Sequence, residues 1–506
     1  MPSTSLTILS LPNATGMRNG ASEVTAYPAL ARQFNISMIE RLSAMQVACV
    51  SPPSADAAWI VARSRIDRRS KASIGVLGCS TTAGCGALSP LVRCSMPLSW
   101  GRHAHDALAS AMREPSVRVE TSIFQKNSVE ANFFLGCTRE LLPVRPDVVV
   151  VEVLQNVYNG DLDSLVTSLV GAIRDAAPGV PILFLAWLSL HKFGEGPGHL
   201  MPQLRRLAAT LGFDVADVPA ALRRGLSVNS VPWHTLSAKD TFARTYHGLD
   251  HHPNALGHDL LGNLAALCIA RRLKGPPRIG SQLGGAVYDR QQKQLALGSV
   301  GEEQCYVSAD TMPVVARGGF VLQDDGGLKG VKKLGYSSRR VGDTLTLGPL
   351  EVHPRVGEAL DTRMCLSVMR VRLGYLISTH PGMGELHAQC VGGCSCRPIK
   401  STFMRRELPF PRFSANARSA MHSTPGQQRS TENVTMTAHT FFIANLLNQS
   451  NDACRVLLRH KAAPLSEPWR SLSGSRVRVD SMTIMRHGGA LSVPCGTKVS
   501  RIDDVR

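Results

Sequence analysis

A run of eight residues, Asp147–Leu154 (DVVVVEVL), constrains the fold of this chain more than any other feature. A nearly continuous apolar, β-branched run is typical of a parallel strand that is buried on both faces of a sheet. Further runs of this kind predict four more strands, at Lys71–Gly78, Val117–Phe124, Val180–Trp187 and Phe213–Val218.

Helical patterns lie between and after these runs, at Ser99–Met112, Leu162–Ala176, Met201–Leu211 and Asn254–Leu273. Strands that alternate with helices of this length are typical of an α/β fold with a parallel sheet. Because such connections are right-handed, helices cover both faces of the sheet. We therefore predict a three-layer α/β/α sandwich.

The pattern changes after the Gly- and Pro-rich residues 275–285. The helical period disappears, and polar turns separate short β-forming segments at Leu345–Val352, Cys365–Ser378, Glu385–Cys390, Thr435–Ile443, Cys454–Arg459 and Ser475–Met485. Many short strands without helices predict a β-sandwich or jelly-roll-like domain. We divide the chain into a poorly determined N-terminal segment with a short helix near Ile36–Val47 (1–70), an α/β domain (71–274), a linker (275–285), a β-rich domain (286–490) and a tail (491–506).

Composition limits the classes of partner. The 506 residues fit two to three domains, and 43% hydrophobic with 19% charged residues excludes a mainly disordered chain. The net charge of +18 permits binding to polyanions, but the basic residues are scattered, with local concentrations at residues 63–71 and 404–412. Aromatic residues make up 5%, so the stacking surfaces of single-strand nucleic-acid binders are not evident. We expect no nucleic-acid partner, and polyanion binding stays a rival hypothesis.

No apolar run approaches the roughly 20 residues that a membrane helix needs, so no transmembrane segment is expected. The start, Met1–Gly20, lacks a basic region before its apolar stretch, and we predict no signal peptide there. Four sequons would accept glycans in a secretory pathway, at Asn13, Asn35, Asn433 and Asn448. The expected location is the secretory pathway or the extracellular space, with the cytoplasm as the alternative.

The cysteines support the same location. Cys85 and Cys94 flank one loop, and we expect them to form a disulfide in an oxidising compartment. Three more form a cluster, Cys390, Cys394 and Cys396, for which disulfides are favoured. The alternative, a metal site with His387 as fourth ligand, lacks the second Cys pair that zinc sites use.

A loop of small residues follows the first strand of the α/β domain, at residues 78–86 (GCSTTAGCG). A tight turn after a strand is a common position for a nucleophilic serine, because the turn exposes the hydroxyl and its N–H groups can hold an oxyanion. Ser80 is the candidate nucleophile. The loop lacks the Gly/Lys pattern of a phosphate-binding loop.

Two more positions belong to the same edge of the predicted sheet. Asn156 follows the central strand, where α/β proteins bind ligands. His252 precedes Pro253 and the last helix, which places its imidazole on a loop. Taken singly, each residue has an ordinary structural explanation: turn formation for Ser80, a strand-end cap for Asn156 and an exposed loop position for His252.

Together these blocks resemble the SGNH (GDSL-type) hydrolase family, in a branch that looks algal and carries a β-rich C-terminal domain. Ser80 in Gly78-Cys79-Ser80 matches the family's nucleophile, Asn156 its oxyanion asparagine and His252, before Pro253-Asn254, its catalytic histidine. The resemblance covers roughly residues 71–272 and implies an SGNH, flavodoxin-like sheet.

The chain also departs from the family pattern. Asp250 lies two residues before His252 rather than three, so either Asp250 or a backbone carbonyl is left to orient the imidazole. Cys79 and Val157 replace two acidic residues, and the oxyanion glycine of the family's second block has no clear counterpart near residues 126–132.

The resemblance implies a serine esterase that needs neither metal nor cofactor. Ser80, His252 and Asp250 would be catalytic, and the Ser80 N–H with the Asn156 amide would form the oxyanion hole. The expected substrate is a small-molecule or carbohydrate ester, with O-acetyl or O-acyl groups as the target. The alternatives are an acyltransferase of the same fold and a catalytically decayed glycan-binding protein. Oligomeric state is not predicted.

Overall fold

The computed structural model describes residues 5–8, 48–88, 93–112, 117–126, 131–135, 138–143, 145–154, 162–187, 200–218, 220, 252–274, 300–324, 334–350, 364–378, 384–396, 399–402, 435–447, 453–462, 476–487 and 493–494. The chain divides into two compact units. The first comprises Met1–Asn127, Thr138–Leu295 and Phe410–Ser423, and the second Ser128–Cys137, Ala296–Pro409 and Thr424–Arg506.

The first unit is built on a mostly parallel sheet of seven described strands, in the order β1-β6-β3-β7-β8-β9-β2. Only β2 runs antiparallel to its neighbour, β9. The strands are β1 (Ser5–Ile8), β2 (Cys49–Val50), β3 (Lys71–Gly78), β6 (Arg118–Gln125), β7 (Val148–Glu152), β8 (Ile182–Ala186) and β9 (Asp214–Asp217). The five inner strands follow the flavodoxin-like order 2-1-3-4-5, in which ligands bind where the strand order reverses, here between β3 and β7.

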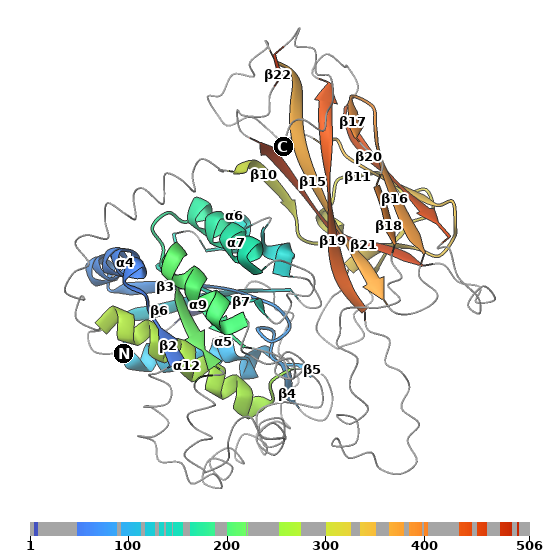
Figure 1. The fold of residues 1–506 in the computed structure, drawn as a ribbon. Helices are drawn as coiled ribbons and strands as arrows, with labels where there is room; N and C mark the ends of the chain where they lie inside the picture. Colours follow the sequence, from blue (N-terminus) through green and yellow to red (C-terminus); the bar gives the residue numbers. More distant parts are fainter. Residues whose placement is uncertain are drawn as a thin grey trace, which may run out of the picture. The chain divides into compact units, whose positions relative to one another are not determined.

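Two groups of helices accompany this sheet. The described helices are α4 (Asp56–Arg69), α5 (Trp100–Ala111), α6 (Thr138–Leu141), α7 (Leu162–Ala176), α9 (Leu200–Leu211) and α12 (Ala255–Lys274). Helix α12 contacts α5 and α4, whereas α7 contacts α6 and α9. Figure 1 shows α6 and α7 on one side of the sheet and α5 and α12 on the other. The mixed α/β architecture predicted from sequence is therefore found.

The core of this unit follows from the sequence pattern. Every residue of β7 and β8 is buried, as expected of central parallel strands. Helix α7 buries residues spaced three and four apart, which places them on one face: Leu162, Leu165, Val166, Leu169, Val170 and Ile173.

Helix α4 lies in the segment for which the sequence analysis predicted no determined fold. Its apolar pattern is weak, because Ile60 and Val61 are exposed while Asp56 is buried. Arg272 of α12 explains the buried acid: its guanidinium lies 2.6 Å from Asp56 and 3.2 Å from Asp214 at the start of β9. The ion pairs join α4 to α12 and β9, beside a buried apolar face of α4 that comprises Ala58, Trp59, Ala62 and Ile66. Hydrophobic periodicity does not report such ion pairs. The helix predicted near Ile36–Val47 lies outside the described residues, as does the linker at 275–285.

The second unit contains two antiparallel sheets in its described part. One has the order β12-β13-β21-β15-β19-β17, with β10 paired to β21 and β22 to β15, and the other is β11-β14-β20-β16-β18. The strands are β10 (Val300–Tyr306), β11 (Val314–Ala316), β12 (Val321–Asp324), β13 (Leu334–Ser338), β14 (Thr344–Leu347), β15 (Met364–Ser378), β16 (Glu385–Val391), β17 (Cys394–Cys396), β18 (Ile399–Thr402), β19 (Thr435–Leu447), β20 (Arg455–Lys461), β21 (Val477–His487) and β22 (Val493–Pro494). All six segments predicted as β contain strands, and β22 lies within the predicted tail. A jelly-roll arrangement stays a prediction.

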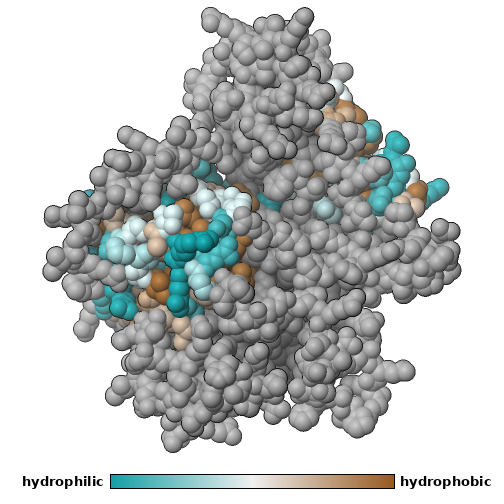
Figure 2. Space-filling model, in the orientation of Figure 1, coloured by the Kyte–Doolittle hydropathy of each residue, from teal (hydrophilic) through white to brown (hydrophobic). Residues whose placement is uncertain are grey.

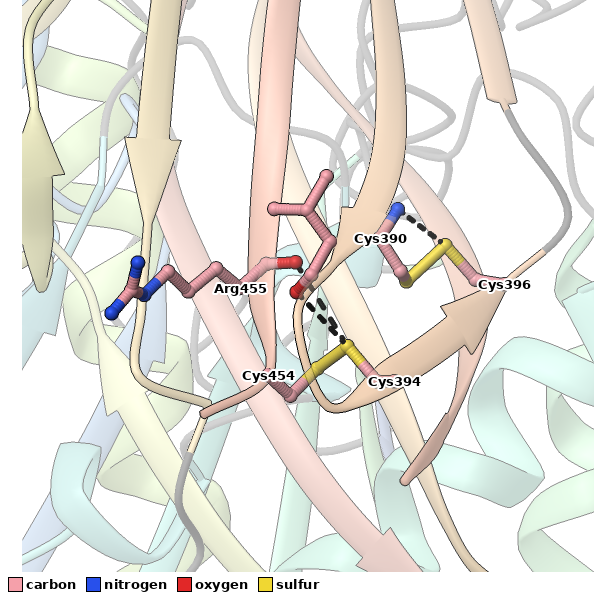
Figure 3. The surroundings of a disulfide bond; sticks show 6 residues. Cys390, Cys394, Cys396, Cys454 and Arg455 are labelled. Atoms are coloured by element: carbon pink, nitrogen blue, oxygen red, sulfur yellow. Dashed lines mark hydrogen bonds between the residues drawn. A yellow bond between two sulfur atoms is a disulfide. The ribbon is translucent and has the colours of Figure 1, made fainter. Parts of the chain in front are cut away.

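Two disulfides join these two sheets. Cys390 of β16 is bonded to Cys396 of β17, and Cys394 of β17 is bonded to Cys454, next to β20 (Figure 3). The Cys394 sulfur also lies 3.7 and 3.9 Å from two carbonyl oxygens. These are contacts only, because a disulfide sulfur has no hydrogen to donate. The predicted preference for disulfides in this cluster is found, and its sulfurs are not available to a metal.

The surface carries few large apolar side chains among the described residues. Those that are exposed are Ile60, Val61, Val315, Val321 and Val341. On the face in Figure 2, hydrophilic and hydrophobic residues lie side by side in the coloured areas. None of the described helices combines the length and the apolar character needed to cross a membrane.

Candidate active site

The Ser80 loop, defined here as residues 79–86, begins directly after β3 and is held by its own backbone. The N–H of Ala83 donates to the carbonyl of Cys79 at 3.1 Å, and the N–H of Cys85 donates to the carbonyl of Ser80 at 3.1 Å. The N–H of Cys79 donates to the Glu152 carbonyl of β7 at 3.3 Å. The turn therefore starts at the carboxyl edge of the sheet, between β3 and β7.

Glycines allow the Ser80 loop to fold this tightly. A Cβ on Gly78 would lie 1.7 Å from the Thr82 hydroxyl oxygen, so only glycine leaves room for Thr82 to fold back over the strand end. Gly84 has a φ of +77°, and a Cβ there would lie 2.1 Å from the carbonyl oxygen of Ser95. L-residues with side chains rarely adopt this conformation.

The loop continues into a hairpin that a disulfide closes. Strand β4 (Cys85–Leu88) pairs with β5 (Arg93–Cys94), and Cys85 is bonded to Cys94. This is the pair that the sequence analysis favoured. Cys79, beside the nucleophile candidate, is buried and is not in a disulfide.

His252 reaches the Ser80 loop from the segment before α12. Pro253 follows it, and the Asn254 side chain accepts a hydrogen bond from the Gly257 N–H at 2.9 Å, which caps the helix. His252 is therefore held at the start of a helix whose body is packed against α5.

The structure brings Ser80 and His252 together. The Ser80 hydroxyl oxygen lies 2.7 Å from Nε2 of His252, a hydrogen-bond distance. Ser80 is 9% exposed and His252 is 6% exposed. A serine hydroxyl bonded to an imidazole at the edge of buried surroundings has the arrangement that activates a serine for nucleophilic attack. The expected proximity is found; the catalytic roles stay a prediction.

The two remaining predicted site residues, Asp250 and Asn156, lie outside the described residues. The nearest described position to Asn156 is Leu154, two residues after the end of β7. The register of the sheet places the end of β7 beside the Ser80 loop, because Glu152 pairs with Gly78. The roles of Asp250 and Asn156 therefore stay predictions.

A buried polar network lies between the end of β7 and the Ser80 loop, and it was not predicted from the sequence. Glu152 is completely buried, and its Oε2 accepts a hydrogen bond from the Thr82 hydroxyl at 2.9 Å. The Thr82 hydroxyl in turn accepts from the indole N–H of Trp100 at 3.1 Å. The signal in the sequence was Glu152 itself, the acidic residue within an otherwise apolar strand run.

Burial changes the charge of Glu152. Loss of solvation raises the pKa of this carboxyl to about 8, against the smaller opposing effect of its hydrogen bonds with Thr82 and Cys79. The carboxyl is therefore mainly protonated and neutral at pH 7. A neutral acid beneath the loop adds no negative charge near the Ser80–His252 pair.

His258, one turn into α12, is a second buried group that the sequence analysis did not assign. Its Nδ1 accepts from the backbone N–H of Trp100 at 3.3 Å, and its Nε2 donates to the carbonyl of Cys85 at 3.0 Å. Burial lowers the pKa of His258 to about 3, so the ring is neutral. It joins α12, α5 and the Ser80 loop, which fixes the loop relative to His252.

The described residues contain no group of three or more His, Cys, Asp or Glu side chains arranged to hold a metal ion. His387, considered in the sequence analysis as a fourth ligand, contacts Glu385 at 3.1 Å.

Comparisons with known proteins give remote likenesses. No family model matches the chain, and no curated protein matches it. Among solved structures, it is similar to a lipase/acylhydrolase from Enterococcus faecalis (16% identity, 41% of this chain and 98% of that chain, TM-score 0.27). It is also similar to a variant of an acetyl-xylooligosaccharide esterase from Geobacillus (13%, 40% and 95%, TM-score 0.29) and to a family 3 carbohydrate esterase from Clostridium thermocellum (14%, 38% and 92%, TM-score 0.23).

Proposed function

We propose that this protein is a serine ester hydrolase that works through an acyl-enzyme on Ser80. The observation that carries the proposal is the 2.7 Å separation of the Ser80 hydroxyl from Nε2 of His252. Its position supports the proposal further, since the pair lies where the strand order reverses between β3 and β7.

The proposed reaction has two steps. His252 Nε2 takes the proton of Ser80 as the hydroxyl oxygen attacks the ester carbonyl, and a tetrahedral oxyanion forms. The imidazolium then gives the proton to the leaving alcohol, and an acyl-enzyme remains. Water, deprotonated by the same imidazole, then attacks the acyl group. As the bond to Ser80 breaks, the imidazolium returns the proton to the serine oxygen, and the acid is released.

The oxyanion requires donors that point to where its charge develops. We assign this role to the backbone N–H of Ser80 and the side-chain amide of Asn156. Asp250, or a backbone carbonyl, orients the second ring nitrogen of His252. These assignments rest on the position of each residue in the sequence.

We further propose an O-acyl group, such as O-acetyl, on a carbohydrate as the substrate. The sequence resemblance to SGNH hydrolases supports this choice. The small residues around Ser80 are compatible with an acyl group brought close to the backbone, because few side chains fill the loop.

A fluorophosphonate probe tests the serine. We expect it to label the intact protein, and we expect labelling to be lost in Ser80→Ala and in His252→Ala but kept in Ser308→Ala, a matched serine in the second unit. Labelling of Ser80→Ala at the intact rate would reject Ser80 as the nucleophile.

Product analysis then separates the proposed hydrolase from its alternatives. Acetylated xylooligosaccharides should release acetate into water. Transfer of acetyl to an added sugar without release of acetate would favour the acyltransferase. Binding of the oligosaccharide without labelling or turnover would favour a decayed, glycan-binding protein.

A further inference from the structure

We propose that Glu152 is the positioning residue of the Ser80 loop: through Thr82, its carboxyl fixes the turn that presents the nucleophile. The inference rests on the proposed function for its kinetic consequences. The role differs from catalysis, because Glu152 lies beneath the loop, fully buried, and contacts Thr82 rather than the reacting atoms.

Glu152 lies where the sheet meets the Ser80 loop. Glu152 is the last residue of β7 and Gly78 the last residue of β3, and the two are paired in the sheet. Its carbonyl binds the N–H of Cys79 and its carboxyl binds the hydroxyl of Thr82. One residue of the rigid sheet therefore holds the turn on both sides of Ser80.

The Thr82 hydroxyl has one hydrogen, and it is used in the bond to Glu152. The same hydroxyl accepts from the indole N–H of Trp100. Trp100 is in turn tied to His258 through its backbone N–H. The chain of bonds runs from the central strand through the loop to the helix that follows His252, so it sets the positions of both members of the Ser80–His252 pair.

The charge state of Glu152 also suits this role. No charged side chain contributes to the raised pKa of Glu152; burial is its main cause. Besides Glu152, two titratable side chains of the described residues hydrogen-bond to the loop: His252 contacts Ser80, and His258 of α12 contacts the Cys85 carbonyl. His103 of α5 interacts electrostatically with His258. A carboxylate in this dry setting would oppose the oxyanion that forms on attack by Ser80, since like charges repel strongly at low dielectric constant. The neutral acid supplies the hydrogen-bond acceptor without that penalty.

Matched substitutions test the role of the hydrogen bond. Thr82→Ser keeps the hydroxyl, and Thr82→Val keeps the shape without it. We expect Thr82→Ser to be labelled by the fluorophosphonate within about threefold of the intact rate, and Thr82→Val to be labelled at least tenfold more slowly. With an ester substrate, the loss in Thr82→Val should fall on kcat and leave KM within about twofold.

Substitutions of Glu152 test the same hydrogen bond at its acceptor. Glu152→Gln keeps a neutral acceptor and should retain most of the labelling rate, whereas Glu152→Leu should lose at least tenfold. Above pH 8 the intact protein should label more slowly as Glu152 ionises, and Glu152→Gln should not show this decline. Asp214→Asn is the control, because Asp214 is also a buried acid but lies at the opposite, amino end of the sheet, at the start of β9.

Hydrogen exchange separates this inference from the proposed function. Peptides that span residues 78–86 should exchange faster in Thr82→Val and Glu152→Leu than in the intact protein, whether or not Ser80 reacts. If the unsubstituted protein is not labelled by the fluorophosphonate, the esterase proposal is rejected. Hydrogen exchange of residues 78–86 would still decide whether Glu152 positions the loop. Unchanged exchange and unchanged labelling in Thr82→Val, which conserves shape, would overturn the inference. Equal losses in Glu152→Gln and Glu152→Leu would also overturn it.

Discussion

Gly86 and His252 are packed so closely that a Cβ on Gly86 would lie 2.7 Å from the Cβ of His252. The same atom would lie 2.6 Å from the carbonyl oxygen of Pro253. The glycine also has a φ of +86°, which disfavours any side chain. It therefore determines how near the Ser80 loop comes to the segment that carries the histidine.

Gly86→Ala should separate Ser80 from His252. Because the added methyl must displace backbone as well as strain φ, we expect a stability loss of about 2–4 kcal/mol and at least a hundredfold fall in ester hydrolysis. Gly342→Ala is the control: its φ is +99°, but a Cβ there meets nothing within 4 Å. Gly342→Ala should lower the free energy of unfolding by about 1–2 kcal/mol, from backbone strain alone, and leave ester hydrolysis unchanged. Equal activity in the two variants would contradict this reading of Gly86.

His252→Ala should reduce ester hydrolysis by about a thousandfold or more, because the serine loses its base. Its position on a loop suggests little effect on stability, but the structure buries it against Gly86 and bonds it to Ser80. We therefore expect a stability loss of about 1–3 kcal/mol, measured by chemical denaturation. Hydrolysis at the intact rate would exclude His252 as the base.

The fold of the first unit is readable from sequence where local and tertiary forces agree. Strand β3 and helix α7 have the predicted limits, Lys71–Gly78 and Leu162–Ala176, because an apolar run in one and a helical period in the other are decisive alone. Helix α4 was not predicted, since exposed Ile60 and Val61 obscure the spacing of its buried face, and its buried Asp56 is paired with Arg272, more than two hundred residues away. Spacing within a window carries no information about such a partner.

The candidate site was predictable from the sequence only in part. Ser80 and His252 lie in loops whose neighbouring strand and helix are strongly patterned, so their shared edge of the sheet could be inferred. The hydrogen-bonded network of Glu152, Thr82 and Trp100 that supports the Ser80 loop could not be inferred from the sequence. The predicted burial of the strand on both faces includes Glu152, but its hydrogen-bond partner Thr82 comes from the Ser80 loop, and Thr82 is in turn bonded to Trp100 of α5. Residue type and local spacing do not identify partners that come from other elements.

The disulfide between Cys49 and Cys268 was not predicted, and it should stabilise the first unit more than Cys390–Cys396 stabilises the second. The two close separations of 219 and 6 residues. Because a longer loop removes more entropy from the unfolded chain, replacing both cysteines by alanine should cost about 5 kcal/mol in the first case and about 2 kcal/mol in the second. Denaturant unfolding of each double variant measures this. Equal losses would contradict the dependence on loop length.

Glu152 should also make the stability of the protein depend on pH. Its pKa rises from 4.5 to about 8 on folding, so the folded state binds a proton that the unfolded state releases. The stabilisation is fully present below pH 4.5 and is lost as pH rises to about 8. Within that window the free energy of unfolding should fall by at most about 1.4 kcal/mol per pH unit from this group.

Glu152→Gln isolates this contribution, because glutamine does not titrate. Denaturation of both proteins between pH 5 and 9 should show a shallower decline in the variant, with the variant gaining relative to the intact protein as pH rises. Asp214 also titrates in part of this range, since burial raises its pKa to about 6, but it is present in both proteins and cancels in the difference. Parallel pH curves for the two proteins would mean that Glu152 is ionised in the folded state, and the neutral acid beneath the Ser80 loop would then be wrong.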